Sequence, residues 1–305
     1  MLGFPQSSTS VINERTTAMP SLLKFSSPAT QLLLASTGIP SRIVPRSQFW
    51  LVIAILGMGL ALPAKADIPV GERAVLQAIY ASTGGANWTG NAGWNGPPGT
   101  ECLDWQGVEC DAAHNHVTKV RIHSNNLVGS LPSITGLTDL EEFQVQNNHL
   151  TGRIPQLAGM TKLRLVVLND NQFSGPIPAL GGLSQLISFV AFSNQLTGSI
   201  PPLTDLSSMM VFNVRSNQLF GSLPSLAGLT SLRSIVLYSN QLSGDLPDVP
   251  HPNALGNGSS LLCLHNDGNG FSPSPNAGWD YATGIAPWYL MCDSTPDPIS
   301  ANGFD

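Results

Sequence analysis

The stretch LEEFQVQNNHLTGRIP, residues 140–155, belongs to a unit that recurs six times along the chain at intervals of 23 residues. With conservative exchanges, every copy follows the pattern L-x-x-L-x-L-x-x-N-x-L-x-G-x-[IL]-P. A fixed period of this length predicts a solenoid, because one copy alone cannot bury its apolar face and must stack on its neighbours. The copies start at Asn115, Thr138, Thr161, Ser184, Ser207 and Thr230, and the last one closes near Pro252.

The L-x-L segment of each copy alternates apolar and polar residues, which is the pattern of a β-strand with one buried face. Stacked copies place these strands side by side in one parallel sheet. Six strands at about 4.8 Å each predict a solenoid about 29 Å long. The residues expected to point inward are Val120, Ile122, Phe143, Val145, Val166, Leu168, Phe189, Ala191, Phe212, Val214, Ile235 and Leu237.

Three positions of the repeat hold the same residue type in all six copies, and each such set is called a column here. All three columns are expected to bond the backbone or to fix its geometry. An amide that recurs among inward-facing apolar residues is expected to bond N–H and C=O groups that would otherwise be buried without partners. A ladder of amides for a polar ligand is the alternative, and the inward direction argues against it. Glycine supplies backbone angles that other residues avoid, and proline fixes the geometry after it. The columns are Asn125, Asn148, Asn171, Asn194, Asn217 and Asn240; Gly129, Gly152, Gly175, Gly198, Gly221 and Gly244; and Pro132, Pro155, Pro178, Pro201, Pro224 and Pro247.

The pattern N-x-L-x-G-x-[IL]-P resembles the plant-type leucine-rich repeat of plant receptor-kinase ectodomains and polygalacturonase-inhibiting proteins. The likeness covers residues 67–252, and segments 72–80, 84–89 and 102–110 look like that family's N-terminal cap. It implies an α/β-type leucine-rich-repeat solenoid with a parallel sheet on its concave face and a disulfide-stapled cap at each end. The unit is one residue shorter than is usual in the family, and no kinase domain is expected after it. The ending Gly303–Phe304–Asp305 resembles that of some exported proteobacterial proteins, which implies a bacterial member.

Apolar groups at both ends of the repeats fit caps. Val75, Leu76, Ile79 and Tyr80 share one face of a short predicted helix that can cover the first strand. Aromatic residues add bulk at each end, and a sugar-binding patch is the alternative role for them. They are Trp88, Trp94 and Trp105 at the first end, and Trp279, Tyr281, Trp288 and Tyr289 at the second.

The N-terminal segment is typical of an export signal. Arg42 and Arg46 precede an apolar run over residues 50–62, and Ala64–Lys65–Ala66 provides a small-x-small cleavage site. The run is shorter than the roughly 20 residues of a membrane span, and an uncleaved anchor is the alternative. We expect a secreted or cell-surface protein divided into an extension with signal (1–66), an N-terminal cap (67–114), six repeats (115–252), a C-terminal cap (253–292) and a tail (293–305).

Charge excludes two classes of partner. Residues 1–66 hold 5 Lys/Arg and 1 Asp/Glu, so the remaining chain holds 8 Lys/Arg against 18 Asp/Glu. An acidic body of this kind has no electrostatic attraction for nucleic acid or for an anionic membrane surface.

The four cysteines lie in two pairs that bracket the repeats. An even count in an exported chain favours disulfides, and the grouping favours Cys102–Cys110 and Cys263–Cys292. A zinc site is the alternative, but neither pair has C-x-x-C spacing.

The solvent-facing strand positions form a surface that can vary without disturbing the repeat. Apolar and aromatic residues gather there in the later copies, with Arg215 between them, which indicates a binding surface. The β-propensity of Val, Phe and Tyr is the alternative explanation. The predicted ligand-binding residues are Val167, Asn169, Val190, Phe192, Asn213, Arg215, Val236 and Tyr238.

No motif of a hydrolase, metalloprotease, P-loop or dinucleotide-binding enzyme occurs in the sequence. We therefore expect no enzymatic activity, no cofactor and no metal; His114, His116 and His123 could gather as a metal site, but isolated surface histidines are the simpler interpretation. The leading hypothesis is recognition of a protein or peptide across the concave sheet, and inhibition of a cell-wall glycosidase is the variant that the resemblance implies. Adhesion to a polysaccharide through the aromatic residues is the alternative, and a hydrolase is a third, weaker one.

Overall fold

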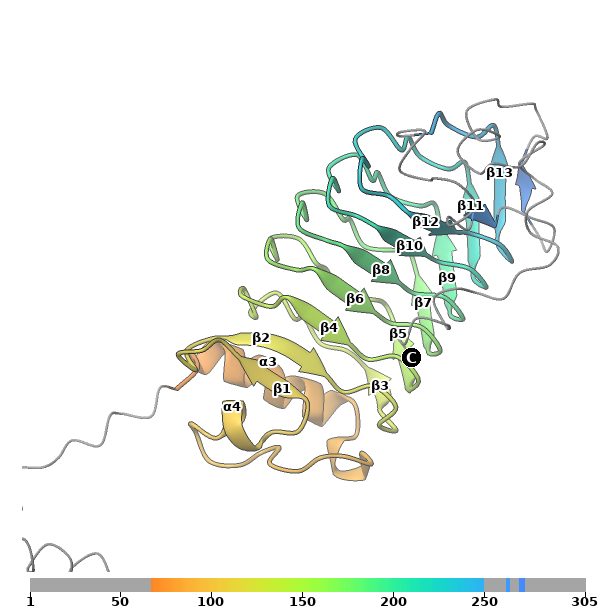
Figure 1. Cartoon of the computed structure of the whole chain (residues 1–305). Coiled ribbons are helices and arrows are strands. Elements are labelled where there is room, and N and C mark those ends of the chain that lie inside the picture. The colour runs from red at the N-terminus through yellow and green to blue at the C-terminus, as the bar shows by residue number, and fades with distance from the viewer. Residues whose placement is uncertain (1–66, 250–261, 264–268, 272–305) are drawn as a thin grey trace, which may run out of the picture. The chain divides into compact units, whose positions relative to one another are not determined.

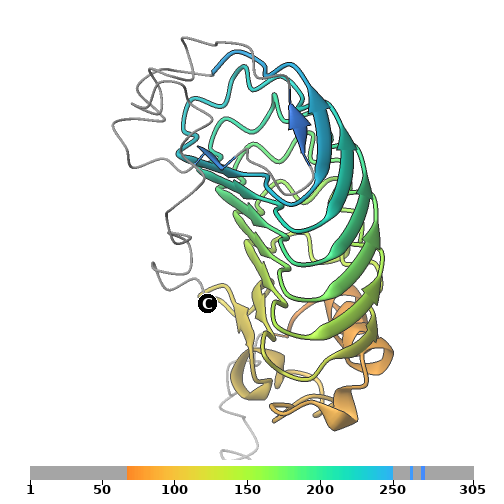
Figure 2. The same ribbon diagram turned by 90° about the vertical axis from the view of Figure 1, so that its right-hand side faces the viewer.

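The computed structural model of the chain describes residues 67–249, 262–263 and 269–271. Within these ranges the strands form two sheets on opposite sides of the stacked turns, as Figures 1 and 2 show. The first, here called the concave sheet, runs in the order β1 (Val108–Cys110), β2 (Val117–Arg121), β4 (Glu142–Gln144), β6 (Leu165–Val167), β8 (Ser188–Val190), β10 (Val211–Asn213), β12 (Ser234–Val236) and β14 (Leu262–Cys263). All of its pairs are parallel except that of β1 with β2.

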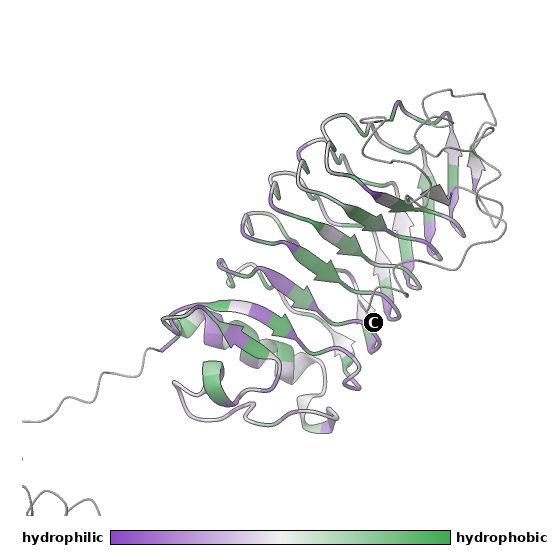
Figure 3. Ribbon diagram, in the orientation of Figure 1, coloured by the Kyte–Doolittle hydropathy of each residue, from purple (hydrophilic) through white to green (hydrophobic). Residues whose placement is uncertain are grey.

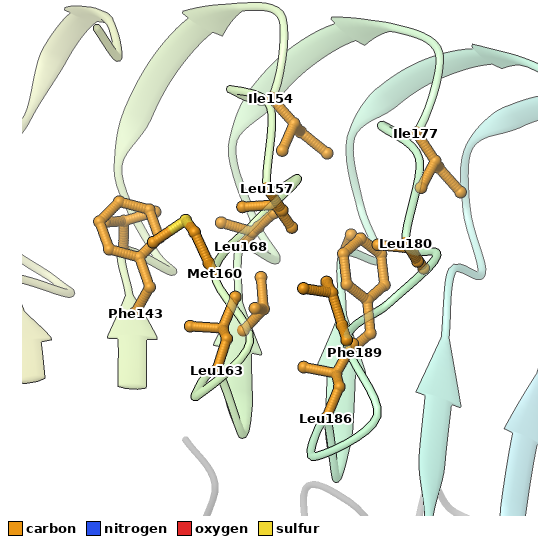
Figure 4. Close-up of a cluster of buried hydrophobic side chains, with 14 of the residues drawn as sticks. Phe143, Ile154, Leu157, Met160, Leu163, Leu168, Ile177, Leu180, Leu186 and Phe189 are labelled. Atoms are coloured by element: carbon orange, nitrogen blue, oxygen red, sulfur yellow. The ribbon is translucent and has the colours of Figure 1, made fainter. Parts of the chain in front are cut away.

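The apolar core lies between the two sheets and runs through every turn. All twelve residues predicted to point inward from the strands are buried, none more than 2% exposed. Phenylalanine rings stack along the axis, with the centroids of Phe189 and Phe212 5.7 Å apart. Figure 4 shows Phe143 beside Met160, and Phe189 beside Leu180 and Leu186. The stacking predicted from the 23-residue period is confirmed.

The second sheet was not predicted. It runs in the order β15 (Gly270–Phe271), β13 (Gln241–Gly244), β11 (Gln218–Gly221), β9 (Gln195–Gly198), β7 (Gln172–Gly175), β5 (His149–Gly152) and β3 (Val128–Ser130). Each of its strands buries one apolar residue at most, for example Phe173 in β7 and Leu196 in β9. A run with a single inward-facing residue has no detectable alternation, so the pattern alone does not reveal it.

Between the two sheets the chain turns through a left-handed residue in every copy. The residues with positive φ at this point are Ser124, Asn147, Asp170, Ser193, Ser216 and Ser239. All six side chains are small and polar and are exposed or half-exposed. Asn and Asp adopt the left-handed region more readily than most residues do.

The asparagine column bonds the backbone at this turn, as predicted. The Asn171 Nδ2 atom donates to the carbonyls of Val145, Leu168 and Asn169 at 2.9, 3.2 and 3.2 Å, and its Oδ1 atom accepts from the N–H of Leu150 at 3.0 Å. Each amide therefore joins its own copy to the preceding one. The glycine column also takes its expected role, with φ between 76° and 125°.

The N-terminal cap contains α3 (Val70–Ser82), η1 (Gly85–Asn87) and α4 (Glu101–Asp104). Leu76 and Ile79 of α3 are fully buried against the core. Trp88, Trp94 and Trp105 are buried as one aromatic cluster, in which the centroids of Trp88 and Trp94 lie 4.9 Å apart. Burial of these three rings supports their packing role and leaves them unavailable to a sugar.

The predicted Cys102–Cys110 disulfide is present and joins α4 to β1. Cys292, the predicted partner of Cys263, lies outside the described residues, as do Trp279, Tyr281, Trp288 and Tyr289. Strands β14 and β15 pair with β12 and β13 and so continue both sheets beyond the sixth copy. Asn269 takes the place of a column asparagine there, since its Oδ1 atom accepts from the N–H of Leu242 at 2.8 Å.

Candidate functional site

The eight predicted binding residues lie together on the concave sheet. Val167, Val190, Asn213 and Val236 are register partners on β6, β8, β10 and β12. Asn169, Phe192, Arg215 and Tyr238 follow two positions later in the same copies, where the ladder continues; the N–H of Ser216, for example, bonds the carbonyl of Tyr238 at 3.0 Å. The structure therefore brings all eight into two adjacent columns.

The apolar members form a cluster that is separate from the solenoid core. Val167, Val190 and Phe192 are 3%, 4% and 9% exposed, with Leu165 and Val211 packed against them. Figure 3 shows β6 and β8 as hydrophobic strands, whereas β2 and β4 carry hydrophilic residues. We expected these side chains to be exposed, and the structure shields them almost completely. These three side chains are therefore buried although they are not part of the core between the two sheets.

Arg215 lies over the aromatic part of this cluster. Its guanidinium carbon is 3.9 Å from the ring centroid of Phe192 and 5.6 Å from that of Tyr238. A guanidinium stacked in this way interacts favourably with the π-faces and is held in place by both rings. The combination of an arginine with two aromatic rings is typical of the residues that dominate binding energies at interfaces.

Polar side chains complete the face. The Asn169 Nδ2 atom donates to the Asp170 carboxylate at 2.8 Å, and the Asn213 Oδ1 atom accepts from the N–H of Arg215 at 3.3 Å. Gln146, Ser188 and Ser234 are also buried on the concave side, and they were not among the predicted binding residues. Their identity gave no signal, because glutamine and serine are ordinary at an exposed strand position.

Strand β1 of the cap and the first two copies share a network of paired charges. The Lys119 Nζ atom is 3.0 Å from Glu109 Oε2 and 3.8 Å from Glu142 Oε1. Arg121 pairs with both glutamates as well, at 2.7 Å to Glu142 Oε2. A hydrogen bond from Lys119 and the charge of Arg121 hold the pKa of Glu109 below its ordinary value. Two carboxylates thus neutralise the two cations on which a basic patch would depend.

A hollow of about 240 Å³ lies where the cap meets the first copy, away from the apolar cluster. Thr89 and Gly90 of the cap, Gln106, Arg121, His123 and Asn125 are among its lining residues. The Arg121 side chain is already paired with Glu109 and Glu142, so we do not assign this hollow a ligand.

The three candidate metal-ligating histidines do not gather. His116 is bonded to the Glu72 carboxylate, with its Nδ1 atom 2.7 Å from Glu72 Oε1, and this bond raises the pKa of His116. No group of three His, Cys, Asp or Glu residues in the described ranges is placed to hold a metal ion. In the same ranges no helix has the length and apolar character to span a membrane.

Known proteins similar to this chain are found among solved structures. No protein-family model matches the chain, and no curated protein matches it. Among solved structures, PEPR1–AtPEP1 is similar with a TM-score of 0.60 at 24% identity over 69% of this chain, which spans 30% of the length of that one.

Other similar structures are ectodomains of Arabidopsis receptor proteins. The BIR2 ectodomain from Arabidopsis thaliana has a TM-score of 0.46 at 26% identity, covering 58% of this chain and 95% of its own. Arabidopsis HAESA, in complex with the peptide hormone IDA and the co-receptor SERK1, has a TM-score of 0.44 at 31% identity and covers 52% of this chain and 26% of its own. The likeness to PEPR1, together with the repeat, identifies the chain as a plant-type leucine-rich-repeat solenoid in its fold.

Proposed function

We propose that this protein is an exported, non-enzymatic binding protein that recognises a protein or peptide through its concave sheet. The observation that carries the proposal is the second apolar cluster of Val167, Val190 and Phe192, which lies on the opposite side of the sheet from the core. These side chains are not part of the core between the two sheets. Phe192, stacked with Arg215 and close to Tyr238, supplies the anchor residues that such interfaces use.

Export is supported by two independent features. The segment 42–66 has the pattern of a signal peptide. The Cys102–Cys110 disulfide persists in oxidising compartments and is uncommon in the cytosol.

The test is a selection of displayed peptides on the purified protein, with a glycan array in parallel. Replacement of Phe192, Arg215 and Tyr238 by alanine is expected to weaken binding of selected peptides at least about thirtyfold, because hot-spot residues each contribute about 2 kcal/mol or more. A matched control replaces Phe220 and Arg233, which are exposed outside this cluster. Binding that is lost in the control and kept in the triple variant would place the ligand elsewhere.

Inhibition of a cell-wall glycosidase is a narrower form of the same proposal. It predicts that the wild-type protein slows polygalacturonase and that the triple variant does not. Binding on the glycan array without any selected peptide would favour the polysaccharide alternative instead.

A further inference from the structure

The second sheet presents two rows of side chains to solvent. In β5, β7, β9, β11 and β13 the rows lie on either side of the buried apolar residue of each strand, so both point away from the core. Every member of the first row is exposed. The first row is His149, Gln172, Gln195, Gln218 and Gln241, and the second row is Thr151, Ser174, Thr197, Phe220 and Ser243. Apart from Phe220, this face consists of amides, hydroxyls and one imidazole.

The pairing of the strands brings a hydroxyl of one copy beside the amide of the next. The register partners are Thr151 with Gln172, Ser174 with Gln195, and Thr197 with Gln218. The Thr151 Oγ1 atom already donates to the carbonyl of Gly129 at 3.1 Å, and its oxygen stays available as an acceptor. Each glutamine amide adds two donor hydrogens and an acceptor. Such pairs recur about every 4.8 Å along the sheet, whose strands lie side by side in Figure 1.

The face is uncharged on an acidic body. Strands β5, β7, β9, β11 and β13 contain no Asp, Glu, Lys or Arg. The chain after residue 66 holds 18 Asp/Glu against 8 Lys/Arg. Such a body repels a polyanion, and the face offers no lysine or arginine to hold one. A ligand suited to this face is therefore uncharged and rich in groups that donate and accept hydrogen bonds.

Phe220 is the exception in the second row. It is 54% exposed, and it is the one aromatic side chain among the large exposed hydrophobic residues of the described ranges. Gln218 lies two positions before it on β11, and its register partner on β13 is Gln241. An exposed ring flanked by amides suits a sugar ring. The C–H groups of a pyranose pack on the electron-rich face of the aromatic ring, and its hydroxyls exchange hydrogen bonds with amides around it.

We propose that this face, from β5 to β13, binds an uncharged polysaccharide whose chain lies along the axis of the solenoid. Phe220 stacks on one sugar ring, and the amides of Gln218 and Gln241 bond the hydroxyls of that ring. The hydroxyl–amide pairs of the preceding copies bond successive sugars, because the pairs repeat along the direction of the polysaccharide chain. The site lies on the other sheet from the proposed peptide site, so it is a second binding activity and does not rest on the first.

A protein partner suits this face less well. The centre of a protein–protein interface contains several aromatic or apolar anchors that become buried on binding. Among the residues of β5, β7, β9, β11 and β13, Phe220 is the one large hydrophobic side chain that is exposed. A face with one anchor and many hydrogen-bonding groups favours a ligand that is itself covered with hydroxyls.

Binding of the purified full chain to immobilised polysaccharides tests the proposal. Glucomannan, xyloglucan and mixed-linkage β-glucan are the uncharged probes, and polygalacturonate is the acidic one. The protein is expected to bind at least one uncharged probe and not to bind polygalacturonate. Phe220→Ala is expected to weaken that binding at least about tenfold, because the sugar loses the apolar surface on which it stacks. Phe220→Trp should retain it.

Failure to bind any of the three uncharged probes would overturn the proposal, as would equal affinity of Phe220→Ala and the wild type. Binding to polygalacturonate alone would contradict the uncharged character of the ligand. Val128→Ala is the matched control, because Val128 is 55% exposed on β3, outside the proposed site, and this variant should bind as the wild type does.

The two binding proposals fail separately. The variant with alanine at Phe192, Arg215 and Tyr238 should still bind the polysaccharide, and Phe220→Ala should still bind the selected peptides. Loss of polysaccharide binding in the concave-sheet variant and its retention in Phe220→Ala would place the sugar on the concave sheet and refute this site. Self-association of the protein that Phe220→Ala abolishes, measured by sedimentation equilibrium, would assign the face to a second copy of the chain instead.

Discussion

The Oδ1 atom of Asn171 accepts a hydrogen bond from the backbone N–H of Leu150, which lies 21 positions earlier and 3.0 Å away. The amide of the same side chain donates to three carbonyls, one of them Val145 in the preceding copy. One side chain therefore bonds four backbone groups of two adjacent turns. Repeats that contact only their neighbours depend on such junctions for cooperative stability.

Asn171→Ala is expected to lower the free energy of unfolding by about 3 kcal/mol or more, because it leaves buried backbone groups without partners. Urea unfolding followed by circular dichroism measures the change. Gln172→Ala is the matched control, since Gln172 is the next residue and is exposed; an exposed substitution of this kind should stay within about 0.5 kcal/mol. Equal losses in the two variants would refute the role of the column.

Phe189→Ala is expected to destabilise the protein by about 3–5 kcal/mol, because the fully buried ring stacks on Phe212 and its removal leaves a cavity in the core. Phe220→Ala changes the same side chain at a site that is 54% exposed. The difference between the two unfolding midpoints isolates the contribution of the core, and no difference would show that the phenylalanine stack is not a stabilising element.

Replacement of both Cys102 and Cys110 by serine is expected to cost about 2–3 kcal/mol of stability, as the loop of a disulfide at this separation predicts. The bond joins residues 8 positions apart in the N-terminal cap. The loss should appear first in the fluorescence of the cap, where Trp88, Trp94 and Trp105 are buried together. Simultaneous loss of cap fluorescence and of the β-sheet signal would show that the cap does not unfold separately.

The His116–Glu72 pair is expected to make the cap sensitive to pH. The Glu72 carboxylate also accepts a hydrogen bond from the N–H of Val117 at 2.7 Å, so the pair links α3 to β2. Because the pKa of His116 is raised in the folded protein, its stabilising effect is complete below the unfolded value of about 6.5 and is lost as pH rises through the folded value.

Melting temperatures of the wild type and of His116→Gln, measured between pH 5 and pH 9, are expected to differ at acid pH and to converge as the pH rises. His123→Gln, at an exposed position of the first copy, serves as the control. A difference that grows towards alkaline pH would have the wrong sign and would exclude the pair as its cause.

The repeat alone determined the architecture of this protein, because a unit that cannot bury its own apolar face has to stack. The same period also predicted which residues point inward. It predicted the backbone hydrogen bonds of the asparagines and the left-handed glycines as well, because both meet local requirements of the backbone. Pairing of Cys102 with Cys110 was also predicted, from the grouping of the four cysteines and the expectation of an exported chain.

Tertiary structure decided whatever depends on groups that are distant in sequence. The second sheet forms only when successive turns align, since a strand such as β7 buries a single apolar residue and has no pattern of its own. Neutralisation of Lys119 and Arg121 required Glu109 and Glu142 from neighbouring strands. The shielding of Val167 and Phe192, and the unpartnered Nδ2 atom of Asn213, are properties of a surface assembled from several copies. Composition and spacing describe one copy at a time, whereas burial and hydrogen bonding at the concave sheet depend on the neighbouring copies.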